Sequence, residues 1–126
     1  MFELRVHRQF SAAHAIRMAG QMETLHGHDW RVVVQVVGDA LDADGLLCDF
    51  HALEASVDRV LAPFRNRSLN DVAPFDRTNP TAELVAQHVA NEVARALPAG
   101  VRLGSVSIGE APGCEAIYRP DMKVHA

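Results

Sequence analysis

Three histidines near the N-terminus have the residue type and spacing of a metal site. His26 and His28 stand two apart in Leu25-His26-Gly27-His28-Asp29-Trp30, where an apolar strand pattern begins. Side chains at positions i and i+2 of a strand point to the same face, so the two imidazoles should lie side by side. His14 lies at the end of the preceding strand pattern, which we expect to pair antiparallel with this one. Three imidazoles with an open fourth position would suit a catalytic zinc.

Other readings of these histidines remain open. The chain has 7 histidines, and a His-x-His pair alone is weak support for a metal site. Gly27 favours a site because it removes a side chain between the two donors and lets a ligand approach the backbone. His88 lies on an apolar helical stripe and is predicted to be a partly buried core residue rather than a ligand. Solvent-facing positions are sufficient for His7 and His51.

Composition limits the class of protein. The 126 residues predict one globular domain, 1–126, with 48% hydrophobic residues. The formal net charge of −4 argues against nucleic acid or an anionic membrane surface as a partner. No apolar run approaches the roughly 20 residues of a membrane span. Two cysteines, Cys48 and Cys114, do not make a disulfide framework. We therefore expect a cytoplasmic protein.

Hydrophobic periodicity predicts the elements that position the histidines. Alternation of apolar residues indicates strands, and spacings of three and four indicate helices. Asp49 is predicted to cap the first helix, and Asn79, followed by Pro80 at the first helical position, to cap the second. The order β-β-α-α-β-β predicts an α+β fold in which an antiparallel sheet carries both helices on one face. The predicted strands are 1–10, 30–38, 101–108 and 116–119, with a short extended piece at 46–50, helices at 52–61 and 79–97, and loops at 11–25 and 65–76.

The second predicted strand has apolar residues on both faces. Trp30, Val32, Val34 and Val36 share one face, and valines also occupy the other. A sheet that is apolar on both sides needs a cover on both. We expect the helices on one face and another subunit on the other.

Motifs spread over nearly the whole chain resemble the 6-pyruvoyl-tetrahydropterin synthase family, including its bacterial branch, 6-carboxytetrahydropterin synthase. The resemblance is carried by Phe10-Ser11-Ala12-Ala13-His14, His26-Gly27-His28, Asp49-Phe50, Leu69-Asn70-Asp71, Asn79-Pro80-Thr81-Ala82-Glu83, and Glu110 eight residues before Tyr118.

The resemblance implies a tunnelling fold (T-fold) whose subunits form a ring around a β-barrel, as a homohexamer made of a dimer of trimers with active sites between subunits. It implies that His14, His26 and His28 hold Zn²⁺, and that the substrate is 7,8-dihydroneopterin triphosphate or a related pterin. Glu110 would bind the pterin ring, because a carboxylate offers two acceptors to the amino group and ring N–H. By its own pattern, Glu110 is equally a solvated hairpin residue.

The departures from the family pattern fall on proton transfer. Met22 stands where the bacterial branch has a cysteine, and Arg65 and Asn66 stand where the family has an Asp-His pair. None of the three is a usable base near neutral pH. Ala111 replaces a threonine that often follows the family glutamate. Glu23, next to Met22, is a candidate substitute base, and a solvent-facing position for it is equally open.

Three hypotheses follow. The first is a zinc-dependent, pterin-converting lyase with an altered general base, in which Glu23 is catalytic. The second is a catalytically silent paralogue that binds zinc and pterin. The third is a purely structural zinc, which ranks last because the sequence offers no fourth ligand to close the site. A reactive role for Cys114 is a weak alternative, since free cysteines are mostly buried.

Overall fold

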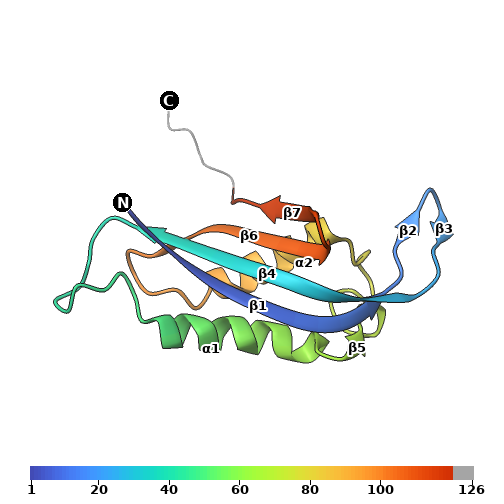
Figure 1. The fold of residues 1–126 in the computed structure, drawn as a ribbon, viewed down its shortest axis with the longest axis horizontal. Coiled ribbons are helices and arrows are strands. Elements are labelled where there is room, and N and C mark those ends of the chain that lie inside the picture. The colour runs from blue at the N-terminus through green and yellow to red at the C-terminus, as the bar shows by residue number, and fades with distance from the viewer. Residues whose placement is uncertain (121–126) are drawn as a thin grey trace.

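A computed structural model describes residues 1–120 of the chain. These residues form a five-stranded sheet with two helices packed on one face (Figure 1). The strands are in the order β5-β1-β4-β6-β7. A separate two-stranded hairpin projects beyond the end of the sheet where β1 ends and β4 begins (Figure 1). The elements are β1 (Phe2–His14), β2 (Arg17–Met18), β3 (Gln21–Met22), β4 (His26–Gly38), α1 (Phe50–Leu61), η1 (Ala62–Phe64), β5 (Arg67–Ser68), η2 (Leu69–Asp71), α2 (Ala82–Ala94), β6 (Arg102–Ala111) and β7 (Cys114–Tyr118).

The pairing of β1 with β4 dominates the sheet. The two strands run antiparallel in one unbroken register, from Phe2 opposite Gly38 to His14 opposite His26. The predicted antiparallel pairing is thereby confirmed. The predicted loop at 11–25 is wrong at its start, because β1 continues to His14, and it contains the short strands β2 and β3. Its end at residue 25 is correct, but the predicted strand at 30–38 starts too late, because β4 already begins at His26. Small residues at the end of β1 hide the apolar alternation, while backbone pairing across the strands keeps them extended.

The core lies between the sheet and the two helices. Trp30, Val32, Val34 and Val36 of β4 are completely buried on the helix-facing side. They face a layer of buried aliphatic residues from the helices, which includes Leu53, Val57, Val85, Val89 and Val93. The opposite face of the sheet is more polar, and there the Ser105 hydroxyl donates to Gln35 Oε1 at 2.7 Å. A covering subunit on this face stays a prediction.

The two helices start differently from the predictions. Asp49 caps α1 as predicted and accepts from the His51 N–H at 2.9 Å, so the helix begins at Phe50 and the predicted extended piece at 46–50 is wrong. The cap of α2 is Thr81, which accepts from the Leu84 N–H at 3.1 Å. The predicted cap, Asn79, is wrong because its side chain bonds to another segment.

Both edges of the sheet are short of partners. β5 pairs only with Ala12 and Ala13 of β1, so the N-terminal part of that strand lacks a neighbour among residues 1–120. β7 forms the other edge (Figure 1). Open edges of this kind favour pairing with another chain. In the part of the chain that is described, neither helix is long and apolar enough to cross a membrane.

Candidate metal and substrate site

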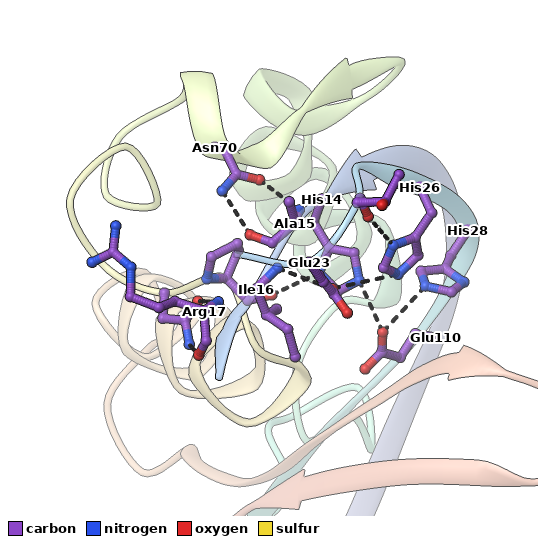
Figure 2. Close-up of polar contacts among 12 residues, drawn as sticks. His14, Ala15, Ile16, Arg17, Glu23, His26, His28, Asn70 and Glu110 are labelled. Carbon is purple, nitrogen blue, oxygen red and sulfur yellow. Dashed lines mark hydrogen bonds and ion pairs between the residues drawn. The ribbon is translucent and has the colours of Figure 1, made fainter. Parts of the chain in front are cut away.

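The three predicted histidines come together at one end of the β1–β4 pair (Figure 2). His14 is the last residue of β1, and its partner across the ladder is His26, with His28 two residues further along β4. The ring centroids lie 4.7 Å apart for His14 and His26, 5.1 Å for His14 and His28, and 4.7 Å for His26 and His28. One ligand atom from each ring lies within 4.8 Å of the others. The spacing rule of the strand is sufficient to explain this cluster.

Backbone carbonyls fix which nitrogen of two rings is free. His14 Nδ1 lies 2.8 Å from the Pro80 carbonyl oxygen, and His26 Nδ1 lies 2.8 Å from that of Thr24. A carbonyl only accepts, so each Nδ1 carries a proton, and in the neutral form of each ring Nε2 presents a lone pair. Such outer hydrogen bonds orient histidines that bind metals.

Two of these nitrogens are buried without a partner. Among residues 1–120, Nε2 of His14 and Nε2 of His28 make no hydrogen bond. An orphaned buried nitrogen is costly unless something binds it. The donor set of three imidazoles therefore fits a metal ion such as zinc.

Trp30 packs against two rings of the histidine cluster. Its ring lies edge-on to His14, with centroids 4.8 Å apart, and to His28 at 5.7 Å. Its indole N–H donates to the Ala12 carbonyl at 3.1 Å, which fixes the ring. Burial lowers the pKa of His28, partly opposed by the charge of Glu110. A lowered pKa keeps His28 neutral, which is the form that binds metals.

Glu110, near the end of β6, faces the histidines (Figure 2). Its Oε2 lies 3.1 Å from His14 Nε2 and 3.3 Å from His28 Nε2. The side chain is 32% exposed, so it is not a fully solvated hairpin residue. A hollow of about 420 Å³, within the range of small-molecule sites, adjoins it and is lined also by Ala82, Glu83, Ile108, Cys114, Glu115 and Ala116.

Glu23 also points into the site rather than away from it (Figure 2). Its Oε1 lies 3.7 Å from His26 Nε2 and accepts from the Ile16 N–H at 2.9 Å. Its own N–H donates to the Ile16 carbonyl at 3.0 Å, which closes the base of the β2–β3 hairpin. By contrast, the neighbouring Met22 is 54% exposed.

Two asparagines fasten the segment between His14 and this hairpin, a role that the sequence did not reveal. Asn70 Oδ1 accepts from the Ala15 N–H at 2.9 Å, and its Nδ2 donates to the Ala15 carbonyl at 2.8 Å. Asn79 makes the same pair of bonds with Arg17, at 2.7 and 2.9 Å. Together with Glu23, they satisfy the backbone of residues 15–17; we call these three side chains the backbone clamp.

The other residues that differ from the family pattern, Arg65, Asn66 and Ala111, have structural surroundings of their own. Arg65 donates to the Gln9 carbonyl at 3.1 Å. Asn66 adopts a φ of 59° and donates its N–H to the Ser11 carbonyl at 2.7 Å. Asparagine tolerates this left-handed conformation better than most residues. Ala111 and Cys114 are exposed in the last hairpin, so Cys114 is not the buried residue that was expected.

Comparisons with known proteins show the family and the fold of the chain. The family model of 6-pyruvoyl tetrahydropterin synthase matches residues 3–121. The chain therefore belongs to this family. A dihydroneopterin monophosphate aldolase from Pyrococcus furiosus is 34% identical over 101 residues, covering 80% of this chain and 82% of its own.

Two further relatives extend the comparison. A 6-carboxy-5,6,7,8-tetrahydropterin synthase from Bacillus subtilis is 33% identical, covering 94% of this chain and 86% of its own. The solved structure of Caenorhabditis elegans 6-pyruvoyl tetrahydropterin synthase superposes with a TM-score of 0.83 at 24% identity, covering 95% and 96% of the two chains. The predicted T-fold is thereby confirmed.

Proposed function

We propose that this protein is a zinc-dependent lyase that acts on the side chain of a phosphorylated 7,8-dihydroneopterin. The observation that carries the proposal is the cluster of three Nε2 atoms with a carboxylate on either side, Glu23 and Glu110. His14, His26 and His28 would hold the metal. Bound zinc supplies a Lewis acid that makes coordinated hydroxyl groups more acidic and stabilises charge that develops on oxygen.

Glu110 anchors the pterin ring in this proposal. An ionised carboxylate has two acceptor oxygens, and the pterin edge presents an amino group and a ring N–H as matching donors. The adjoining hollow of about 420 Å³ offers space for the ring beside Ile108. The amino group and ring N–H lie across the pterin from the side chain, so in this proposal Glu110 turns away from the histidines as it binds the ring and lets the side chain of the substrate reach them.

Glu23 is the candidate general base. The Ile16 N–H holds its carboxylate beside His26, so the base is positioned before substrate arrives. A carboxylate is a weak base, and it is better matched to an acidified hydroxyl than to a C–H bond. Positioned general bases contribute about 10²–10⁴-fold to rate.

This match favours aldol cleavage, the reaction in the name of the Pyrococcus furiosus relative. Glu23 would take the proton of the 2′-hydroxyl, and the C1′–C2′ bond would break as the 2′-oxygen becomes a carbonyl. The electron pair passes into the C6=N5 imine of the dihydropterin. A phosphorylated glycolaldehyde leaves, and protonation of C1′ gives a hydroxymethyl group.

The decisive test is incubation of zinc-loaded protein with 7,8-dihydroneopterin monophosphate and with the triphosphate, read by mass spectrometry. A hydroxymethylpterin supports aldol cleavage, whereas a carboxy- or pyruvoyl-pterin would assign a different bond. In Glu23→Gln, turnover should fall by about 10²–10⁴-fold with zinc content unchanged. Glu92→Gln is the matched control, because Glu92 lies on α2, pairs with Arg95 at 3.5 Å and does not line the hollow beside Glu110. Unchanged turnover in Glu23→Gln would remove this residue from the mechanism.

A silent zinc- and pterin-binding paralogue is the second candidate. The observation that favours it is the loss of the family's cysteine and Asp-His pair, at Met22, Arg65 and Asn66. It predicts measurable pterin affinity without turnover. If zinc-loaded protein bound no pterin, this candidate would fail as well.

We also propose a cytoplasmic homohexamer, assembled through the open edges of β1 and β7 as a dimer of trimers. Edge-to-edge pairing would close the sheets of three subunits into a barrel and cover their outer faces. Light scattering coupled to size exclusion should give a mass six times the 13.7 kDa of the chain. A monomer at micromolar concentration would contradict this assembly.

A further inference from the structure

We propose that Glu110 is a fourth ligand of the metal in the substrate-free protein, and that it leaves the metal when the pterin ring binds it. This inference rests on the proposed function only in that His14, His26 and His28 hold the ion. It gives one carboxylate two successive partners. No local spacing predicts this fourth ligand, because Glu110 lies more than 80 positions after the histidines.

The distances are those of two ligands on one tetrahedral ion. Zinc binds imidazole nitrogen at about 2.0–2.1 Å and carboxylate oxygen at about 2.0–2.2 Å. Across a tetrahedral angle, such ligand atoms stand about 3.3–3.5 Å apart. Glu110 Oε2 lies 3.1 Å from His14 Nε2 and 3.3 Å from His28 Nε2. The carboxylate oxygen therefore lies near the position that the fourth ligand requires.

With the histidine rings neutral, as metal ligands are, electrostatics favour a cation at this point. The Pro80 carbonyl holds the proton of His14 on Nδ1, so the neutral ring turns a lone pair toward Oε2. Two acceptor atoms at this separation repel each other unless a positive charge lies between them. Within residues 1–120, neither His14 Nε2 nor His28 Nε2 has a hydrogen-bond partner. A metal ion satisfies both nitrogens and the carboxylate at once.

The same carboxylate remains able to exchange its partner. Only Oε2 approaches the histidines, and the side chain is 32% exposed beside the hollow of the last hairpin. A pterin edge entering there can offer two N–H donors to Glu110. The ring then takes the carboxylate away and frees a ligand position for the hydroxyl groups of the substrate. Binding of the ring would thus free a ligand position on the metal. A polyol without a pterin ring would leave Glu110 bound and the metal four-coordinate.

Cobalt(II)-substituted protein provides the test, because visible absorption reports the ligands of cobalt directly. We expect Glu110→Gln to change the cobalt spectrum and to weaken metal binding at least tenfold in chelator competition. Unsubstituted 7,8-dihydropterin has the ring but no side-chain hydroxyls. It should shift the spectrum of the wild type and leave that of Glu110→Gln unchanged. Glu92→Gln on α2, away from this hollow, should behave as the wild type throughout.

The outcomes separate this inference from the proposed function. Equal spectra and equal metal affinities in wild type and Glu110→Gln would overturn the fourth-ligand role while leaving the three-histidine site intact. Metal binding that survives His28→Ala unchanged would overturn the site itself. The wild-type spectrum with and without dihydropterin needs no variant, so a folding defect in Glu110→Gln does not remove the test. No spectral response of the wild type to bound dihydropterin would overturn the exchange of partners.

Discussion

Replacing Asn70 by alanine should destabilise the protein by about 1–3 kcal/mol. Its amide makes two hydrogen bonds to the backbone of Ala15, at 2.9 and 2.8 Å, in a partly buried setting. A hydrogen bond contributes a net of about 0.5–1.5 kcal/mol, and two of them give the stated range. Urea unfolding monitored by circular dichroism measures this loss as a lower midpoint at an unchanged slope.

Asn79→Ala is the matched control for this measurement. Asn79 makes the same pair of bonds with Arg17, but at an exposed position. Water can replace those bonds after the substitution, so we expect a loss below about 1 kcal/mol. If Asn70→Ala were no more destabilising than Asn79→Ala, burial would not determine the strength of the backbone clamp, and the reasoning would be refuted.

Two further predictions concern pH. Hydrogen bonds from Arg8 hold the pKa of Asp58 below its usual 3.8, so the ionised carboxylate stabilises the fold above that pH and loses this contribution as the pH falls through the lowered pKa. Asp58→Asn should flatten the acid limb of stability by under about 1 kcal/mol, measured by urea unfolding from pH 6 to 2. Burial against Phe64 and Phe75 lowers the pKa of His88 below 6.5, with Glu92 opposing and Arg95 adding to the shift. The neutral ring therefore stabilises the fold above pH 6.5, and this contribution is lost as the pH falls below that value. His88→Leu should remove that loss of stability between pH 7.5 and 5.5. An unchanged dependence of stability on pH in either variant would contradict its prediction.

Local patterns in the sequence were sufficient to predict the main helices and strands and the clustering of the three histidines. The period of two along β4 predicted that His26 and His28 share a face, and the rings indeed meet there. The predicted core position of His88 is confirmed by its contacts with two phenylalanines. These features depend on neighbours within a few positions, or on the pairing of consecutive strands.

Contacts between residues far apart in the chain could not be predicted from the sequence. Asn79 reads as a helix cap, but its amide binds Arg17, 62 positions away. Asn70 reaches Ala15 across 55 positions. The inward direction of Glu23 depends on one hydrogen bond from the Ile16 N–H. No periodicity encodes these bonds, because each depends on how separate segments pack.

The histidine cluster has a consequence for how the chain finds its fold. Trp30, Val32 and Val34 share one face of β4, whereas Arg31 and Gln35 share the other with Val33, so a slip of one residue against β1 would exchange an apolar surface for a mixed one. Burial of the apolar face therefore already specifies the alignment of the two strands. Only with His14 opposite His26 do the three imidazoles share a face. A slip would turn His14 to the other side, so a bound metal ion would add stability to the correct alignment alone and reinforce the register that burial selects.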